Sequence, residues 1–259
     1  MTVQNPQFYY ANYFIDLAHM ATSSNNTDAL KTRLLDKRPK MQFTTNGETG
    51  SSATFTWTPS SAQTIGRLII QNSNWSSFTA TYNGGTNFST PISVSGSSPG
   101  HFYFEFDEVS VTSITITVSA TSPAGEEKKV GQIIYTKNLY SFPDAASAIV
   151  INPEPQQRVN KLSSGRSVKY VIDSDIYNFE ASMRFVSPSQ LTSLTTLLDE
   201  NDINHVFFIT RPDTSAGSWD GVGDHVFIEN GRDIRNFSGN FFNAGHDVSF
   251  IMKPSGGIT

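Results

Sequence analysis

Short alternating segments separated by turn residues fill the first half of this chain, and they constrain its fold more than any other feature. Residues 53–57 (ATFTW) and 77–82 (SFTATY) alternate bulky and small or polar side chains. Further short runs of strand-forming residues are 67–71, 102–106, 113–118 and 130–136. Four turn-forming sequences lie between the runs: Asn46-Gly47, Asn83-Gly84-Gly85, Ser98-Pro99-Gly100 and Pro123-Ala124-Gly125. This spacing predicts an antiparallel β-sandwich or barrel.

The sequence pattern of the second half predicts an α+β arrangement. Residues 176–186 alternate as a strand, and a helix is expected at about 188–200. Ser187 suits the N-cap and Pro188 the first turn of that helix. Leucines follow at helical spacing: Leu191, Leu194, Leu197 and Leu198. Further strands are expected at 205–210, 225–229 and 247–252, with a long Gly-rich loop from Arg211 to Asp224.

Length and charge indicate two domains, residues 1–140 and 141–259. A chain of 259 residues exceeds the usual size of a single core, and SFPDAAS at 141–147 is a plausible joint. The first part carries nine Lys/Arg and nine Asp/Glu, whereas the second carries nine and fourteen, which accounts for the net charge of −5.

That net charge disfavours nucleic acid as a partner. No apolar run is long enough to span a membrane, the start does not resemble a signal peptide, and zero cysteines exclude disulfides and thiolate sites.

Residues that could carry catalysis or bind metal are scattered. The histidines His19, His101, His205, His225 and His246 show no ligand spacing. Asp173 and Asp175 resemble half of an oxygen-ligand loop, but the later ligand positions do not match a calcium loop, which leaves a turn between strands as the simpler interpretation.

The remaining candidates for chemistry are equally weak. The carboxylates Asp199, Glu200, Asp213, Asp220 and Asp224 offer no pair for glycoside hydrolysis. No Gly-x-Ser-x-Gly sequence is present, and the Gly-Gly and Gly-x-Gly sequences read as turns. The basic run 31–40 is interrupted by Leu34 and Leu35, which favours a solvated loop beside a buried leucine pair. We therefore expect no catalytic residue, no metal, no cofactor and no enzyme activity.

Trp75 is the one residue for which the sequence suggests a ligand contact. It lies in the polar stretch QNSNWSSF between two expected strands, where a tryptophan could contact a sugar or a protein. Trp75, Asn74 and Tyr82 are the candidate ligand- or partner-binding residues. Packing at the edge of the sandwich is the alternative role for Trp75.

The first half resembles the discoidin-like (galactose-binding-like) jelly roll. The order of four segments carries the resemblance: TDALKTRLLDKRPKMQFTT, TFTWTPSSAQTIGRLIIQNSN, FYFEFDEVSVTSITITVS and KKVGQIIYT. The family's paired cysteines are absent here, as in many of its intracellular members. The resemblance implies a sandwich over residues 1–140 that binds a sugar, a lipid or a protein, and the fold by itself names no ligand.

The second half resembles the ring-forming domain of tailed-phage distal tail and baseplate-hub proteins. The resemblance is carried by GRSVKYVIDSDIYNFEASMRFV, SPSQLTSLTTLLDEND, HVFFITRPD, DHVFIENG and GHDVSFIMKP. It implies a small β-barrel over residues 141–259, flanked by the one helix, that forms a closed ring, usually a hexamer. In this chain the sandwich precedes the barrel, whereas the usual distal tail protein begins with the ring domain.

These observations leave three hypotheses. The main one is a structural protein of the virion, made in the host cytoplasm, which forms a homo-oligomeric ring in a phage tail tip or baseplate and connects the tail tube to hub and fibre proteins. The alternative is a carbohydrate-binding protein for attachment to the host surface, a role that a tail-tip subunit could combine with the first. A glycoside-active enzyme is the least favoured, because no carboxylate pair supports it.

Overall fold

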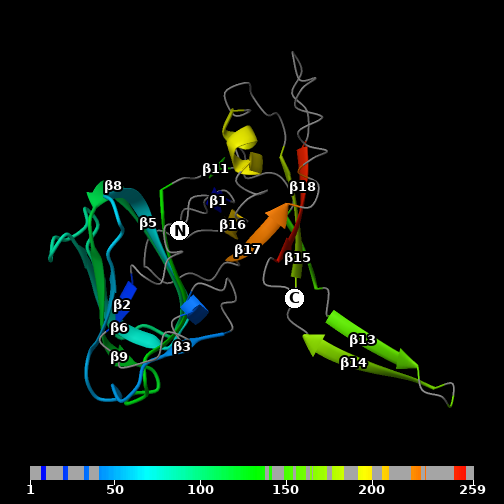
Figure 1. Ribbon diagram of the computed structural model, residues 1–259, viewed down its shortest axis with the longest axis horizontal. Helices are drawn as coiled ribbons and strands as arrows, with labels where there is room; N and C mark the ends of the chain where they lie inside the picture. Colours follow the sequence, from blue (N-terminus) through cyan, green and yellow to red (C-terminus); the bar gives the residue numbers. More distant parts are fainter. Residues whose placement is uncertain are drawn as a thin grey trace. The chain divides into compact units, whose positions relative to one another are not determined.

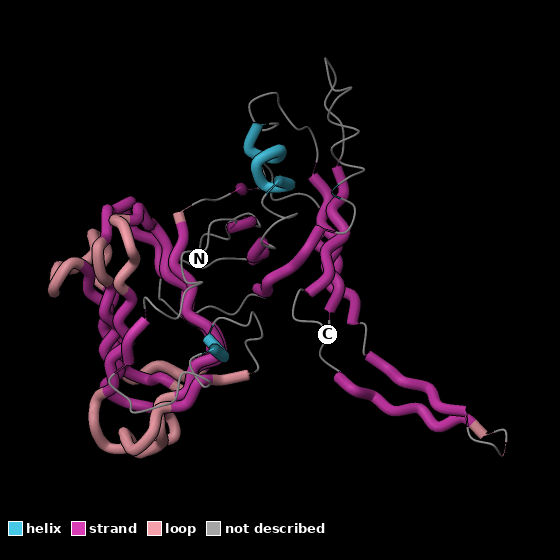
Figure 2. The backbone as a smooth tube through the Cα atoms, viewed as in Figure 1, coloured by secondary structure: helices cyan, strands magenta, loops and turns pink. Residues whose placement is uncertain are grey.

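The structure is a computed structural model of the chain, and two compact units are recognised in it. It describes residues 7–9, 20–22, 32–34, 41–137, 140–141, 149–153, 156–161, 164, 166–173, 177–183, 192–199, 206–209, 223–228, 231 and 248–254. One unit comprises Met1–Leu139 and Ile209–Gly223, and the other comprises Tyr140–Phe208 and Asp224–Thr259. Strands dominate both units (Figures 1 and 2), so the expectation of a mainly β chain is confirmed. The assignment of a discoidin-like domain to residues 1–140 and a ring-forming domain to 141–259 stays a prediction.

Two sheets make up the β-sandwich of the first unit. One has the strand order β3-β10-β5-β8 and the other the order β2-β4-β9-β6-β7. The first sheet contains β3 (Phe43–Thr44), β5 (Gln63–Ser73), β8 (Gly100–Val111) and β10 (Lys129–Thr136). The second contains β2 (Met20–Thr22), β4 (Ala53–Trp57), β6 (Trp75–Tyr82), β7 (Ile92–Val94) and β9 (Ile114–Thr121). All pairings in both sheets are antiparallel, which confirms the expected sandwich.

Aromatic and branched apolar side chains from both sheets form the core between them. Strand β4 shows how the sequence directs this, because Ala53, Phe55 and Trp57 are buried while the threonines between them are half-buried. Successive side chains in a strand point to opposite faces, so the alternation places one set in the core. Trp57 stacks on Tyr135 of β10 with ring centroids 5.0 Å apart, which joins the two sheets.

Asn83 and the two glycines after it form the turn at the end of β6. All three have positive φ, 47° for Asn83, 79° for Gly84 and 117° for Gly85. The Asn83 side-chain oxygen accepts a hydrogen bond from the Thr112 backbone N–H at 2.6 Å, which ties this turn to the β8–β9 connection. Asparagine and glycine adopt such conformations at the least cost, so the turn predicted from the sequence is confirmed.

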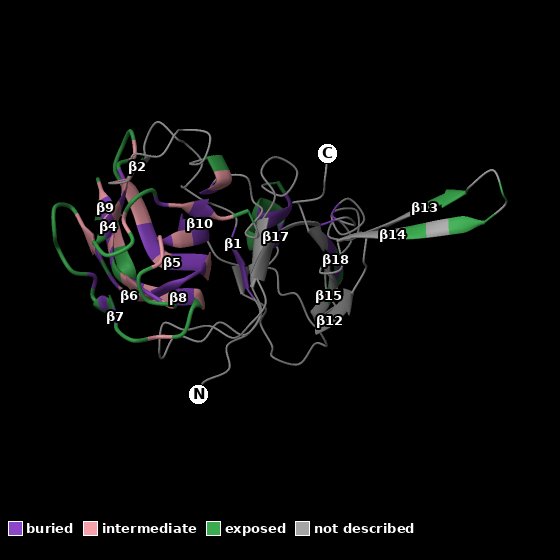
Figure 3. Cartoon of the chain, turned by 90° about the horizontal axis from the view of Figure 1, so that it is seen from below, coloured by how far each residue is buried: buried purple, intermediate pink, exposed green. Residues whose placement is uncertain are grey.

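Strand β1 (Gln7–Tyr9), whose three residues are all buried (Figure 3), contacts strand β8 of the four-stranded sheet through Tyr9. The hydroxyl oxygens of Tyr9 and Tyr103 lie 2.6 Å apart. Beside them, Arg67 of β5 donates to the Glu105 carboxylate of β8 at 2.6 Å. Burial raises the pKa of Tyr103 to about 12, and burial likewise raises the pKa of Tyr9 well above its ordinary value. A group of polar side chains therefore lies where Tyr9 contacts β8.

The described part of the second unit contains a β-sheet, a β-hairpin and the helix at residues 192–199. Its strands β16-β17-β18-β15-β12 are neighbours in that order, and β13 pairs with β14 as a separate two-stranded sheet. The strands are β11 (Tyr140–Ser141), β12 (Ile149–Pro153), β13 (Gln156–Lys161), β14 (Ser167–Asp173), β15 (Tyr177–Met183), β16 (Val206–Ile209), β17 (Gly223–Ile228) and β18 (Val248–Pro254). Closure of the larger sheet into a barrel stays a prediction.

A helix covers residues 192–199, inside the range predicted from the leucine spacing. Leu194, Leu197 and Leu198 are all buried, which confirms these three positions of the predicted apolar face. Leu191 lies outside the described residues. The expected N-cap Ser187 and first-turn Pro188 lie outside the described residues. Among those that the structure does describe, no helix is long and apolar enough to cross a membrane.

Candidate ligand-binding site

Trp75 is a core residue, so the ligand contact that the sequence suggested for it is wrong. Its side chain is 0% exposed, and its ring lies 5.0 Å from the Phe55 ring and 5.6 Å from the Phe78 ring. The physical reason is that β6 begins at Trp75 itself, which places this residue on the inward face of the strand. A fully enclosed indole offers no surface on which a sugar could stack.

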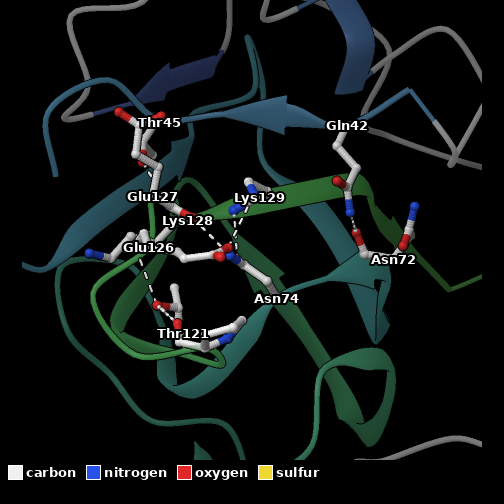
Figure 4. A network of polar contacts seen from close by, with 10 residues as sticks. Gln42, Thr45, Asn72, Asn74, Thr121, Glu126, Glu127, Lys128 and Lys129 are labelled. Atoms are coloured by element: carbon white, nitrogen blue, oxygen red, sulfur yellow. Dashed lines mark hydrogen bonds and ion pairs between the residues drawn. The ribbon is translucent and has the colours of Figure 1, made fainter. Parts of the chain in front are cut away.

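Asn74 has a structural role at the same end of the sandwich. Its side-chain nitrogen donates to the Glu127 carbonyl at 2.8 Å, and its side-chain oxygen accepts from the Lys129 backbone N–H at 2.8 Å. Figure 4 shows the Asn74 carboxamide pointing at this segment of chain. The carboxamide thus holds the β9–β10 connection against the end of β5.

Tyr82 lies at the opposite end of β6 from Trp75, about 23 Å away for a strand of this length. It is half-buried and packs on Phe88 with ring centroids 5.0 Å apart. The three residues selected from the sequence therefore do not form one site. A ligand contact by Tyr82 alone stays a prediction.

Lys128 is a buried cation held by main-chain carbonyls. The residue is 1% exposed, and its ammonium group donates to the carbonyl oxygens of Glu48 and Ser51. Its backbone N–H donates to the Thr45 hydroxyl at 2.9 Å, and the Thr45 N–H donates to its carbonyl at 3.0 Å (Figure 4). Lys128 consequently ties the β3–β4 loop to the start of β10.

A second polar group, which we call the Asn72 cluster, is half-buried and consists of Arg33, Gln42, Asn72 and His101. Arg33 donates to the Gln42 carbonyl at 3.2 Å. Figure 4 shows the next contact, in which the Gln42 side chain donates to the Asn72 carbonyl at 2.8 Å. The Asn72 backbone N–H donates to Nδ1 of His101 at 3.3 Å. These contacts connect the 3-10 helix Thr32–Leu34, the residue before β3, and strands β5 and β8.

The backbone at Asn72 brings the cluster together. Asn72 has φ of 50°, and the β5–β8 register shifts between Ile70 and Ser73. A left-handed residue inside a strand produces a local bulge, which redirects the neighbouring side chains. Asparagine tolerates this conformation better than most residues.

The electrostatics of the cluster favour a neutral histidine. Burial lowers the pKa of His101 below its ordinary value. Because Nδ1 accepts the hydrogen bond from Asn72, the proton of the neutral imidazole is on Nε2. The cluster therefore combines the donors of Arg33 and His101 with carboxamides that can both donate and accept.

Several other residues considered in the sequence are not among those that the structure describes. His19, His205, His246, Asp175 and most of the loop 211–224 lie outside the described residues, as does the His225 side chain. Within the described part of the chain, no three His, Asp or Glu side chains converge in a way that would hold a metal ion.

Comparison with known proteins gives matches only at the level of solved structures. No family model matches the chain, and no match to a curated protein was found. A mutant form of chitosan-binding module 1 from a chitosanase/glucanase of Paenibacillus sp. IK-5 is 12% identical, with a TM-score of 0.40 over 52% of this chain and 98% of the module. CpGH89CBM32-5 from Clostridium perfringens, solved with GalNAc-β-1,3-galactose, is 12% identical, with a TM-score of 0.38 over 49% and 99%.

A third similar structure is the CBM32 of AlyQ in complex with 4,5-unsaturated mannuronic acid, 17% identical, with a TM-score of 0.37 over 48% of this chain and 97% of the module. These matches do not support the assignment to a phage tail or baseplate, which stays a prediction.

Proposed function

We propose that the sandwich unit binds carbohydrate through the Asn72 cluster. The observation that carries the proposal is the chain of contacts from Arg33 through Gln42 and Asn72 to His101, all four half-buried. Every sugar hydroxyl both donates and accepts hydrogen bonds, so a site for it needs donors and acceptors side by side. The guanidinium, the two carboxamides and the neutral imidazole supply that combination.

The contacts within the cluster favour binding because they hold the side chains before a ligand arrives. Less conformational entropy is then lost when a ligand binds. Met41, which directly precedes Gln42, is 43% exposed and adds an apolar group of the kind that packs against the C–H groups of a sugar ring. Four or five hydrogen bonds at a net value of about 1 kcal/mol each correspond to a dissociation constant of about 1 mM to 0.2 mM.

This proposal places glycan binding ahead of the ring-subunit hypothesis. Glycan binding by the sandwich unit requires neither a position in a virion nor tail-protein partners. We also propose that the chain binds without turnover, so an oligosaccharide incubated with it should be recovered uncleaved. Chromatography of the oligosaccharide after overnight incubation measures this, and shorter products would contradict it.

A glycan array followed by titration calorimetry on the best ligand tests the proposal. Gln42→Ala removes one carboxamide of the cluster, and we expect affinity to fall about tenfold, as for the loss of about 1.4 kcal/mol. Gln63→Ala is the matched control, because Gln63 is also half-buried and lies at the other end of β5, next to Ser61. Equal effects of the two substitutions, or an array without any bound glycan, would refute the proposal. Melting temperatures of both variants show whether the fold is retained.

A further inference from the structure

Among the strands that the structure describes, β13 and β14 pair with each other as a separate two-stranded sheet. Every hairpin residue whose exposure the structure describes is exposed: Val159, Asn160, Lys161, Ser164, Arg166, Ser167 and Lys169 (Figure 3). An isolated hairpin of two strands is marginally stable in water, because it has no apolar layer behind it. Contact with another protein surface would stabilise the β13–β14 hairpin.

One face of the hairpin combines an apolar side chain with two cations. Val159 pairs directly with Lys169, and Lys161 pairs with Ser167. Since alternate residues of a strand share a face, these four residues lie on the same side. Val159 is 57% exposed, more than any other large apolar side chain in the described part of the chain. A small apolar spot with lysines around it suits an acidic surface.

The sequence of the second half carries the opposite charge, and two of its carboxylates, Glu180 and Asp199, are exposed. Residues 156–173 contain four Lys/Arg and one Asp, a net charge of +3. The other residues from 141 to 259 contain five Lys/Arg and thirteen Asp/Glu, a net charge of −8. The hairpin is therefore the basic part of a half whose sequence is otherwise acidic, so every copy of the chain carries both charges.

We propose that the β13–β14 hairpin docks on the acidic second half of another copy of this chain. The lysines attract the carboxylates of the partner copy, and Val159 becomes covered on docking. The outer edges of β13 and β14 can also pair with a strand of the partner, as unpaired strand edges do. This inference goes beyond glycan binding and does not depend on it.

Sedimentation velocity of the full chain tests this inference, at concentrations up to about 100 µM and at salt from about 50 mM to about 500 mM. We expect self-association that weakens with salt. The double variant K161A/K169A should raise the dissociation constant at least tenfold, and V159T, which keeps a β-branched residue in the strand, should raise it as well. The matched control S60E/S93E changes the net charge by the same amount at exposed positions of the sandwich, and it should associate as the unchanged chain does.

Four results would overturn the inference. The unchanged chain could stay monomeric at about 100 µM in low salt. The lysine variant could associate as strongly as the unchanged chain. The control could weaken association as much as the lysine variant, which would assign the effect to net charge. A monomer that binds poly-glutamate through Lys161 and Lys169 would identify an unrelated acidic polymer as the occupant.

Discussion

Replacing Lys128 by methionine tests whether a buried ammonium organises the end of the sandwich. The substitution keeps an unbranched side chain of similar length but removes the charge and its donors. In the structure the ammonium donates to two carbonyl oxygens, those of Glu48 and Ser51. A hydrogen bond that involves a charged group contributes about 1.5–3 kcal/mol.

The magnitude follows from these contacts. Removing two such bonds would lower the free energy of unfolding by at most about 3–6 kcal/mol. Part of this loss is offset because Ser51 is exposed and its carbonyl can bind water instead. The ammonium also no longer has to be buried, which offsets a further part. We expect the free energy of unfolding to fall by about 3 kcal/mol, and the melting temperature by about 6–12 °C for a unit of this size.

Lys129→Met is the matched control. Lys129 is the next residue along the chain, but its side chain is 38% exposed and pairs with Glu126 at 3.1 Å. An exposed ion pair of this kind contributes about 0–1 kcal/mol, so the control should change stability little.

Urea unfolding followed by the fluorescence of the buried Trp57 and Trp75 measures the difference. Hydrogen exchange adds a local measurement, because loss of the Lys128 contact should increase exchange in the β3–β4 loop. Equal effects of the two methionine substitutions, or an unchanged midpoint for Lys128→Met, would refute the reasoning.

Three further predictions follow from burial and protonation. Trp75→Ala should lower the free energy of unfolding by about 3–5 kcal/mol in urea titrations, and glycan affinity measured under folded conditions should not change. Affinity for glycan should be constant from about pH 8 to 7 and fall below about pH 6.5 in calorimetry, because protonation of His101 removes the acceptor for the Asn72 N–H. Burial raises the pKa of Tyr103 to about 12. The buried neutral tyrosine therefore contributes about 3 kcal/mol to the free energy of unfolding below about pH 10, and this contribution is lost between about pH 10 and 12. Circular dichroism measured across that pH range would follow the loss.

The strands of the sandwich were predictable where one face is buried. The alternation in ATFTW marks β4 with the bounds found in the structure, Ala53–Trp57. The same rule explains why the β13–β14 hairpin was not predicted. Alternation in a sequence reflects a buried face, and the described residues of the hairpin are exposed on both faces, so no alternating pattern is required there.

The candidate site was harder to predict because its residues come from separate elements. Gln42 and Asn72 are 30 positions apart, and Asn72 and His101 are 29 apart, so no spacing rule connects them. Only Asn72 carried a local signal, as an asparagine within a polar stretch that can take a positive φ. Trp75 was misjudged for a related reason, because the polar residues before it suggested a long turn where the next strand begins at once.

Tyr9 is synthesised long before the residue of β8 that it contacts. Tyr9 contacts Tyr103 across 94 positions of sequence, and at about 5–20 residues per second the ribosome needs about 5–20 s to make the intervening chain. The contact between Tyr9 and Tyr103 can therefore form only after most of the sandwich sequence has been synthesised.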